Sequence, residues 1–332
     1  HRIQDASRLM DGSIAVVDNS KTLRVYDSAG AHRWTAGRAG EGPGEFRHPT
    51  RARQIRGDSI VVWDVAGNRL SIFTPAGEFV RDAAVTALNR PAAAWGTTNA
   101  GDLLLEARGG ERQQIGGRNA LVQTSEFFLV NLSGQVKAEL GIRTFVTLYQ
   151  EVDADGAFSP ALFAVPAVLA AGPEGLWYGT GEEYELRLIG EQGVLRQIVR
   201  WDGPDRSFTD ADVQAVIALW SEDQAPEARN RLQEYARSHP RASTYPAYQG
   251  VMVDGLGRIW IQQYVPEHIR TEHQDWMVLT RDGSEILGVV AAPSGLRIMD
   301  AGSDWVLATE KDEMDVERLV LRALTRSPVG QS

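Results

Sequence analysis

The sequence contains no cysteine among its 332 residues. Without a thiol the chain cannot form a disulfide framework, a zinc–thiolate site or a cysteine nucleophile. Long apolar runs are also missing: the longest candidate, residues 161–171, contains Pro166 and falls short of the roughly 18–20 residues that cross a bilayer. The sequence therefore predicts no transmembrane segment of its own.

Positively charged residues are also few in this sequence. The chain has 34 Lys+Arg against 44 Asp+Glu, a net charge of −10, and only Lys21, Lys137 and Lys311 are lysines. An acidic chain repels phosphate backbones and anionic lipids, so we expect neither nucleic acid nor a lipid surface as a partner. A basic or neutral protein is the better match.

Glycine is plentiful, and it follows a repeat. Six times a turn precedes a short apolar run, and the glycines of these turns are Gly12, Gly57, Gly101, Gly175, Gly255 and Gly302. A second glycine turn follows in most units, so each unit reads as about four short strands in about 45 residues. That period is typical of a propeller blade. The sequence predicts an all-β fold, a six-bladed β-propeller that forms a single domain over residues 1–332.

The two ends of the chain suggest how the ring closes. The last unit lacks a recognisable second turn, so we expect the N-terminal strand to complete the sixth blade. With no disulfide available, strand pairing is the expected closure. The chain also begins at His1 almost inside a strand pattern, as a processed mature chain would.

A helical hairpin is predicted as an insertion between blades 4 and 5, over about residues 205–240. Four apolar residues have the spacing of one helical face: Val213, Val216, Ile217 and Trp220. Thr209 is a candidate N-cap, and a second helix is expected from Pro226 to just before His239. The third unit is expected to carry two extended loops, residues 108–124 and 144–160.

The aromatic residues fall into two groups. Trp177, Trp260 and Trp305 share one position of the repeat, which favours a place in the core. A second group comes with the insertion: Trp220, Tyr235, Tyr245 and Tyr248. Insertions in repeat proteins gather on the binding face, so this second group is the predicted partner-binding surface.

Residues 37–49 carry a family resemblance. Gly40, Gly42, Pro43, Gly44 and Phe46 follow each other as in the linker loop of NHL-type six-bladed β-propellers, with Phe46 expected to fill the gap between two blades. The first, second and fifth units also resemble NHL blades, and no helix follows the loop as a phosphate-binding loop requires. The resemblance to exported bacterial propellers of this kind implies a periplasmic or secreted protein.

Because propellers offer broad rigid faces, the first functional hypothesis is a non-enzymatic binding or scaffolding protein. It would be an accessory subunit docked on a larger, membrane-associated complex. No cofactor is expected under this hypothesis. A small-molecule or glycan sensor is a further alternative.

A metal-dependent enzyme is another alternative. Six-bladed propellers include lactonases with calcium at the mouth of the central channel, and a fold of this kind implies oxygen ligands at the ends of inner strands. The candidates are Asp18, Asp64, Glu106 and Glu310, with Asn19, Glu182, Gln262 and Gln263 as further oxygen donors. Alternatively, Asp18 and Asp64 hydrogen-bond backbone amides in their turns. No Gly-x-Ser-x-Gly elbow supports triad chemistry, and His268 and His273 are predicted to lie in a solvated loop.

Overall fold

Short apolar strands, separated by tight turns, make up most of this protein. The structure, a computed structural model, describes residues 2–151 and 157–325. In these residues the strands form six antiparallel sheets, and two helices complete the fold. We number the sheets 1 to 6 in chain order.

Sheets 1, 2, 4 and 5 have four strands each, in chain order. Sheet 1 contains β1 (Ile3–Arg8), β2 (Ile14–Asp18), β3 (Leu23–Tyr26) and β4 (His32–Ala36). Sheet 2 contains β5 (Pro49–Gln54), β6 (Ile60–Asp64), β7 (Arg69–Phe73) and β8 (Phe79–Ala84). Sheet 4 contains β14 (Val168–Gly172), β15 (Gly175–Gly179), β16 (Glu185–Gly190) and β17 (Leu195–Arg200). Sheet 5 contains β18 (Tyr248–Val253), β19 (Ile259–Gln263), β20 (His273–Leu279) and β21 (Ile286–Pro293).

Sheets 3 and 6 differ from the others in strand number. Sheet 3 has five strands: β9 (Ala92–Thr97), β10 (Leu103–Ile115), β11 (Arg118–Val130), β12 (Val136–Gln150) and β13 (Phe158–Pro160). Sheet 6 has three within the described residues: β22 (Arg297–Ala301), β23 (Trp305–Lys311) and β24 (Glu317–Ala323). The helices α1 (Asp210–Trp220) and α2 (Pro226–Ser238) lie between β17 and β18.

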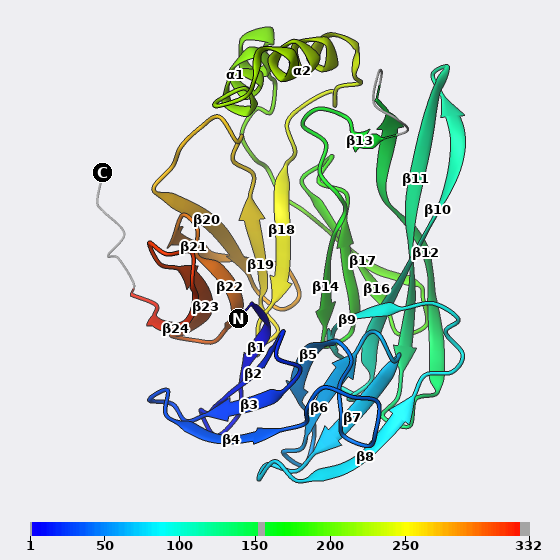
Figure 1. Ribbon diagram of the computed structural model, residues 1–332, viewed down its shortest axis with the longest axis vertical. Helices are drawn as coiled ribbons and strands as arrows, with labels where there is room; N and C mark the ends of the chain where they lie inside the picture. The colour runs from blue at the N-terminus through cyan, green and yellow to red at the C-terminus, as the bar shows by residue number, and fades with distance from the viewer. Residues whose placement is uncertain (1, 152–156, 326–332) are drawn as a thin grey trace.

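The sheets bury their apolar faces against one another in chain order, and the last packs on the first. One apolar residue pair marks each interface from sheet 1 onward: Val17 and Val62, Val61 and Leu105, Leu104 and Leu176, Leu186 and Ile261, Trp260 and Val306, and Leu307 and Val16. Figure 1 shows the sheets following one another in chain order, with β22 to β24 of the last sheet beside β1 of the first. This all-β arrangement is consistent with a β-propeller.

Phe46 lies where the sequence predicts it, between sheets 1 and 2. Its ring is fully buried in the cluster that these sheets share and lies 5.9 Å from the ring of Phe73. Gly37, with φ of +75°, makes room for it, because a Cβ there would come within 2.3 Å of the Phe46 ring. The glycine-rich loop is therefore a packing element between neighbouring sheets.

The expectation that the N-terminal strand completes the sixth sheet is wrong. β1 pairs with β2, with Ala6 opposite Val16, as the innermost strand of sheet 1. Asp312 forms the turn between β23 and β24 by accepting hydrogen bonds from the amides of Met314 and Val316. The second glycine turn of the other sheets joins their third and fourth strands, and sheet 6 has no such turn within the described residues.

Within residues 2–151 and 157–325, the ring therefore closes through side chains and apolar packing, with no strand pairing between sheets 6 and 1. On one side of β1, the buried carboxylate of Asp5 accepts hydrogen bonds from Arg51 at 3.0 Å, from Arg53 at 2.5 Å and from the Ala52 amide at 2.9 Å, all on β5. We call Asp5, Arg51 and Arg53 the charge latch. It fixes β1 against sheet 2.

On the other side, sheet 6 holds the backbone of β1. The Arg8 amide donates to Asp300 at 2.9 Å, and the Ile3 amide donates to Glu317 at 2.7 Å. Arg297 donates to the Ile3 carbonyl at 2.9 Å. Charged side chains from sheets 2 and 6 thus hold β1 on both sides. In a ring closed by a shared sheet, backbone hydrogen bonds between paired strands would do this.

The two loops expected in the third unit are mostly strands. β10 and β11 pair without interruption from Leu103 with Val130 to Ile115 with Arg118, and β12 extends to Gln150. Gly116 and Gly117 both have positive φ and form the two-residue turn that a hairpin prefers. The polar, glycine-containing sequence forms a hairpin that extends beyond the body of the sheet, where β10 is exposed from Arg108 to Gln114. Residues 152–156 of the second expected loop lie outside the described residues.

The helical insertion is confirmed. Thr209 caps α1 as predicted and forms a capping box with Asp212, and α2 starts at Pro226 and ends at Ser238. No helix in residues 2–151 and 157–325 has the length and apolar character needed to cross a membrane.

Removing the charge latch should destabilise the whole ring. Asp5→Ala leaves two guanidinium groups without their buried carboxylate, and we expect a loss of about 3 kcal/mol in the free energy of unfolding, measured by urea titration. Glu41→Ala removes the same charge from an exposed pair with Arg47 and should cost less than about 1 kcal/mol. Equal losses in the two variants would contradict the latch.

The latch should also weaken in acid. Burial alone would raise the pKa of Asp5, but the charges of Arg53 and Arg51 outweigh it and hold that pKa below its usual value of 3.8. A carboxyl with a lowered folded-state pKa stabilises the fold above its unfolded pKa, and loses that contribution as the pH falls through the folded value. The stability difference between wild type and Asp5→Asn should therefore be larger at about pH 7 than at about pH 3 in urea titrations. A difference that does not change with pH would show that Asp5 is not the titrating group.

Candidate functional site

The chain's insertions share one side of the ring. In antiparallel sheets built in chain order, the connection between the second and third strands emerges on the same side as the connection to the next sheet. The β10–β11 turn connects the second and third strands of sheet 3. The α1–α2 hairpin lies in the connection from sheet 4 to sheet 5. Figure 1 shows both at the same end of the molecule. We call this side the insertion face.

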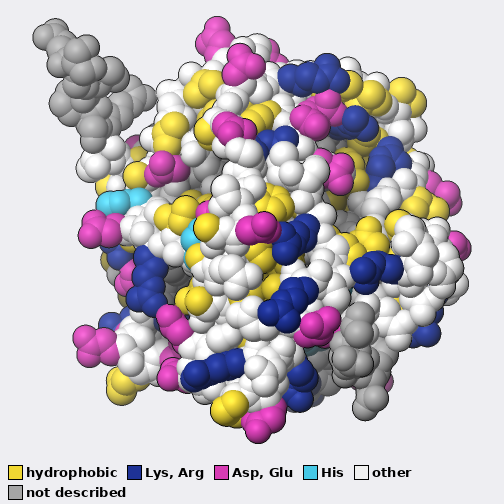
Figure 2. All heavy atoms as spheres, turned by 90° about the horizontal axis from the view of Figure 1, so that it is seen from above, with side chains coloured by type: hydrophobic (Ala, Val, Ile, Leu, Met, Phe, Trp, Pro, Cys, Tyr) yellow, Lys and Arg dark blue, Asp and Glu magenta, His cyan; other side chains and the backbone are white. Residues whose placement is uncertain are grey.

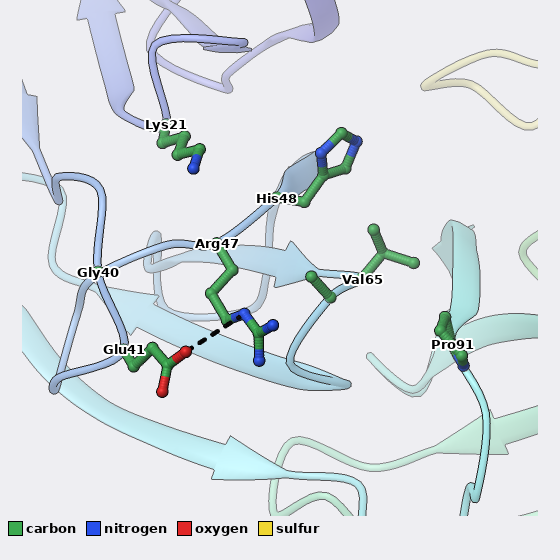
Figure 3. A pocket seen from close by; sticks show the side chains of 8 residues that line it. Lys21, Gly40, Glu41, Arg47, His48, Val65 and Pro91 are labelled. Carbon is green, nitrogen blue, oxygen red and sulfur yellow. Dashed lines mark ion pairs between the residues drawn. The ribbon is translucent and has the colours of Figure 1, made fainter.

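A basic hollow of about 610 Å³ lies on this face over sheets 1 to 3. Figure 3 shows Lys21, Arg47 and His48 around it, with Val65 and Pro91 on the far side. Glu41 forms the single ion pair drawn there, 3.6 Å from Arg47. The hollow could attract an anion, but the Arg47 side chain is 53% exposed, so water and salt screen that attraction.

Buried charge fixes the loop beside the hollow. Asp64, fully buried at the end of β6, accepts the Arg47 amide at 2.7 Å and the His48 amide at 2.8 Å. Arg69 donates to the carbonyls of Glu41 and Glu45 from the next strand. The linker loop is therefore held in one conformation by its own sheet.

A second concavity, the aromatic cleft, lies between sheets 4 and 5 at the base of the insertion. Its volume is about 300 Å³, at the lower end of small-molecule sites. Its principal walls are Tyr184, Trp201, Asp202, Arg206, Tyr245 and Tyr264. The rings of Tyr184 and Trp201 meet edge to face at 5.9 Å, and those of Tyr245 and Tyr264 lie 5.7 Å apart.

The walls of the cleft are fixed by hydrogen bonds. The Tyr184 hydroxyl donates to the Pro204 carbonyl at 2.9 Å, and the Tyr245 amide donates to the Arg206 carbonyl at 2.8 Å. Gly203 is required beside them, because a Cβ at that position would lie 2.2 Å from the Tyr184 ring. The cleft is preformed by contacts between the two ends of the insertion and sheet 4.

The phenols of the cleft stay neutral at ordinary pH. Burial raises the pKa of Tyr245 to about 12, with a further rise from nearby Asp212, and burial raises the pKa of Tyr264 to about 12 as well. Asp205 has the opposite shift, since hydrogen bonds from Ser207 lower its pKa. Near neutral pH the cleft therefore presents uncharged phenol rings beside the ionised carboxylate of Asp205.

The helical insertion is anchored on two sides. Its own small core joins Val213, Ile217 and Ala236 to Leu162 of the segment that follows β13. The Leu162 amide and carbonyl bond the chain at Pro240 and Ala242, at 2.8 and 2.9 Å. Across α1, His268 lies 3.4 Å from Asp212 and is largely buried, so this histidine is not in a solvated loop as predicted.

The four predicted partner-binding aromatics all have contacts inside the protein. Trp220 donates to Glu267 at 2.9 Å, Tyr235 stacks on His239 with ring centroids 4.2 Å apart, and Tyr245 lines the aromatic cleft. Tyr248 is not in the insertion: it is the first residue of β18, 1% exposed, with its hydroxyl bonded to the Glu185 carbonyl. The Tyr248 ring fills the space between sheets 4 and 5 and is therefore not on the surface where a partner could contact it. Partner contact by the other three stays a prediction.

The structure places the four predicted metal ligands in four different sheets. Asp18 accepts the Ser20 amide at 2.9 Å and Arg24 at 2.6 Å, and Asp64 bonds the two loop amides described above. Glu106 accepts Trp95 and Arg108, both at 2.9 Å, and Glu310 pairs with Arg322. Across residues 2–151 and 157–325, no three His, Asp or Glu side chains converge in a way that could hold a metal ion.

The sequence did not single out Tyr184, Trp201 or Tyr264. Trp177 and Trp260, which it assigned to the core, are indeed buried. Trp201 differs from them because it follows the outermost strand of its sheet, immediately before the insertion. The sequence could have identified Trp201 as a candidate site residue, because it is an aromatic residue that lies outside the repeat position and next to an insertion.

Comparison with known proteins assigns no function. No family model and no curated protein matches the chain. Similar solved structures include a member of the DUF4221 family from Bacteroides vulgatus, with 11% identity, a TM-score of 0.49 and coverage of 97% of this chain and 94% of that one. Others are a streptogramin B lyase (11% identity, TM-score 0.44, coverage 98% and 84%) and a virginiamycin B lyase from Staphylococcus aureus (10%, 0.42, 96% and 84%).

Calcium should leave the melting temperature unchanged. Asp18, Asp64 and Glu106 already accept hydrogen bonds from donors within their own sheets, so binding an ion would break those bonds. Thermal unfolding with about 10 mM calcium, a concentration above the Kd of typical extracellular calcium sites, would be compared with sodium chloride of equal ionic strength. A rise specific to calcium, absent in Asp64→Ala, would show that the metal-site prediction is right.

Proposed function

We propose that this protein is a non-enzymatic binding propeller of six blades, related to the NHL type. It acts outside the cytoplasm and docks on a protein partner as an accessory subunit. The resemblance of the linker loop to exported propellers supports the family and the location. One observation carries the binding role: the two largest departures from the repeat, the α1–α2 hairpin and the β10–β11 hairpin, extend from the same face.

Rigidity of the insertion supports this role. A helical hairpin that is held by Leu162 on one side and by Glu267 on the other loses little conformational entropy when a partner binds. Exposed polar residues such as Gln214 on α1 and Arg231 on α2 remain available for contact. Figure 2 shows acidic, basic and apolar side chains interspersed at this end of the molecule. Such a surface has the mixed character of a protein interface and not the single sign of a nucleic-acid site.

The alternative hypothesis of a divalent-cation hydrolase has less support. The candidate carboxylates serve as acceptors for backbone amides, indole and guanidinium groups in separate sheets. A small-molecule sensor has one supporting observation, the aromatic cleft.

Site-specific photocrosslinking tests the binding face. A photoreactive phenylalanine at Gln214 or Arg231 should give one crosslinked product of discrete mass in cells that naturally produce the protein. The matched controls are the same residue at Ala29 and Ala76, which are exposed in turns between third and fourth strands, on the opposite face.

Mass spectrometry of the product should identify the same partner from both helix positions. Crosslinking of equal strength from both faces, or none from the helices, would overturn the proposal.

A further inference from the structure

The aromatic cleft combines partly buried aromatic rings with an acidic rim. Trp201 follows β17 and Tyr264 follows β19, so the cleft takes one ring from each of two sheets. Asp202 and Asp205 belong to the lining and are exposed, and Glu183 lies at the same rim. Aromatic faces carry negative electrostatic potential, so rings and carboxylates attract the same kind of group.

We propose that the aromatic cleft binds an organic cation, namely the guanidinium or ammonium group of an Arg or Lys side chain from the partner. This inference rests on the proposed function for the source of the cation. The chain's net charge of −10 favours a basic partner in the same way.

Arg206 shows that the cleft can hold a guanidinium group. Its guanidinium carbon lies 5.3 Å from the centroid of the Tyr184 ring. Its nitrogens donate to the Tyr245 carbonyl at 2.9 Å and lie 3.8 Å from Glu183. A ring face, a carbonyl and a carboxylate together thus hold one cation that belongs to the chain.

The other rings of the cleft have aromatic neighbours: the Trp201 ring lies 5.4 Å from that of Tyr248, and the Tyr264 ring lies 5.7 Å from that of Tyr245. Within the described part of the chain, no Lys or Arg lies over the ring of Trp201 or Tyr264. Arg206 itself is paired with Glu183 at 3.8 Å, so its charge is partly offset. Asp202 has no ion pair among the described residues, and its carboxylate remains available to a second cation beside the Trp201 ring.

The size of the cleft limits what can enter. A volume of about 300 Å³ accommodates one long side chain but not a helix or a folded loop. Since Tyr184, Gly203 and Pro204 already fix the walls, the cleft needs no rearrangement to accept that side chain.

Isothermal titration with the full chain tests the site directly. The probes are N-acetyl-arginine amide and its neutral isostere, N-acetyl-citrulline amide. We expect the arginine probe to bind with a Kd of about 1 mM and the citrulline probe to bind about tenfold more weakly or not at all, because it lacks the charge. Equal affinity of the two probes, or no binding of either, would overturn the inference.

Two variants locate the binding. Trp201→Leu keeps an apolar side chain but removes the ring face, and should weaken the arginine probe about tenfold. Asp202→Asn should weaken it about threefold, and more at low salt than at high salt. Asp58→Asn, on an exposed turn of the opposite face, is the matched control and should bind as wild type. Thermal unfolding verifies that each variant is folded, and wild-type binding by both cleft variants would contradict the site.

Competition separates the cleft from the proposed function. If a partner side chain occupies the cleft, the arginine probe should reduce crosslinking from Gln214 in wild type but not in Trp201→Leu. Crosslinking that persists while the probe is bound would show that the cleft takes a free cation, and would overturn the assignment to a partner. Binding of the arginine probe without any crosslinked product would contradict the proposed function but not the cation site. If a neutral sugar binds to the cleft more tightly than the arginine probe, the assignment of the cleft to a cation is wrong.

Discussion

The buried carboxylate of Asp5 is the interaction on which the rest of the ring depends. It joins β1 to β5 through Arg51, Arg53 and the Ala52 amide, while Asp300 and Glu317 hold the other side of the same strand. Asp5 thereby joins sheet 1 to sheet 2, and Asp300 and Glu317 join sheet 6 to sheet 1, which share no strand within the described residues. Breaking a buried ion pair is costly because it leaves the partner charges unsatisfied. The position of β1 between its two neighbouring sheets therefore depends on a few charged groups, together with the apolar packing of Leu307 on Val16.

A closed ring fixes the surface that carries the insertions. The aromatic cleft takes Trp201 from the end of sheet 4 and Tyr264 from the end of sheet 5, so its shape depends on the spacing of those two sheets. The helical hairpin depends on the same spacing, since it is held by Leu162 on one side and Glu267 on the other. Binding by this face needs little reorganisation, and this is the advantage that a propeller gives an otherwise small insertion.

The sequence predicted the features that local periodicity encodes. Glycine turns located most strands, the spacing of Val213, Val216 and Ile217 located α1, and Phe46 was correctly assigned to the gap between sheets. The prediction failed where a polar, glycine-containing segment forms a hairpin that extends beyond the body of its sheet, as in β10 and β11. The position of β1 and the convergence of Tyr184, Trp201 and Tyr264 are contacts between distant segments, and no local pattern encodes them.

If the insertion face carries a preformed binding cleft on a closed ring, a ligand of the cleft should change the protein only locally. Amide hydrogen exchange of the full chain, with and without N-acetyl-arginine amide, tests it most directly. Protection should increase at residues 201–207, 245–248 and 263–266, and should remain unchanged in β1 and the other sheets. Protection that appears instead around the basic hollow at residues 40–48, or spreads over the whole ring, would contradict it.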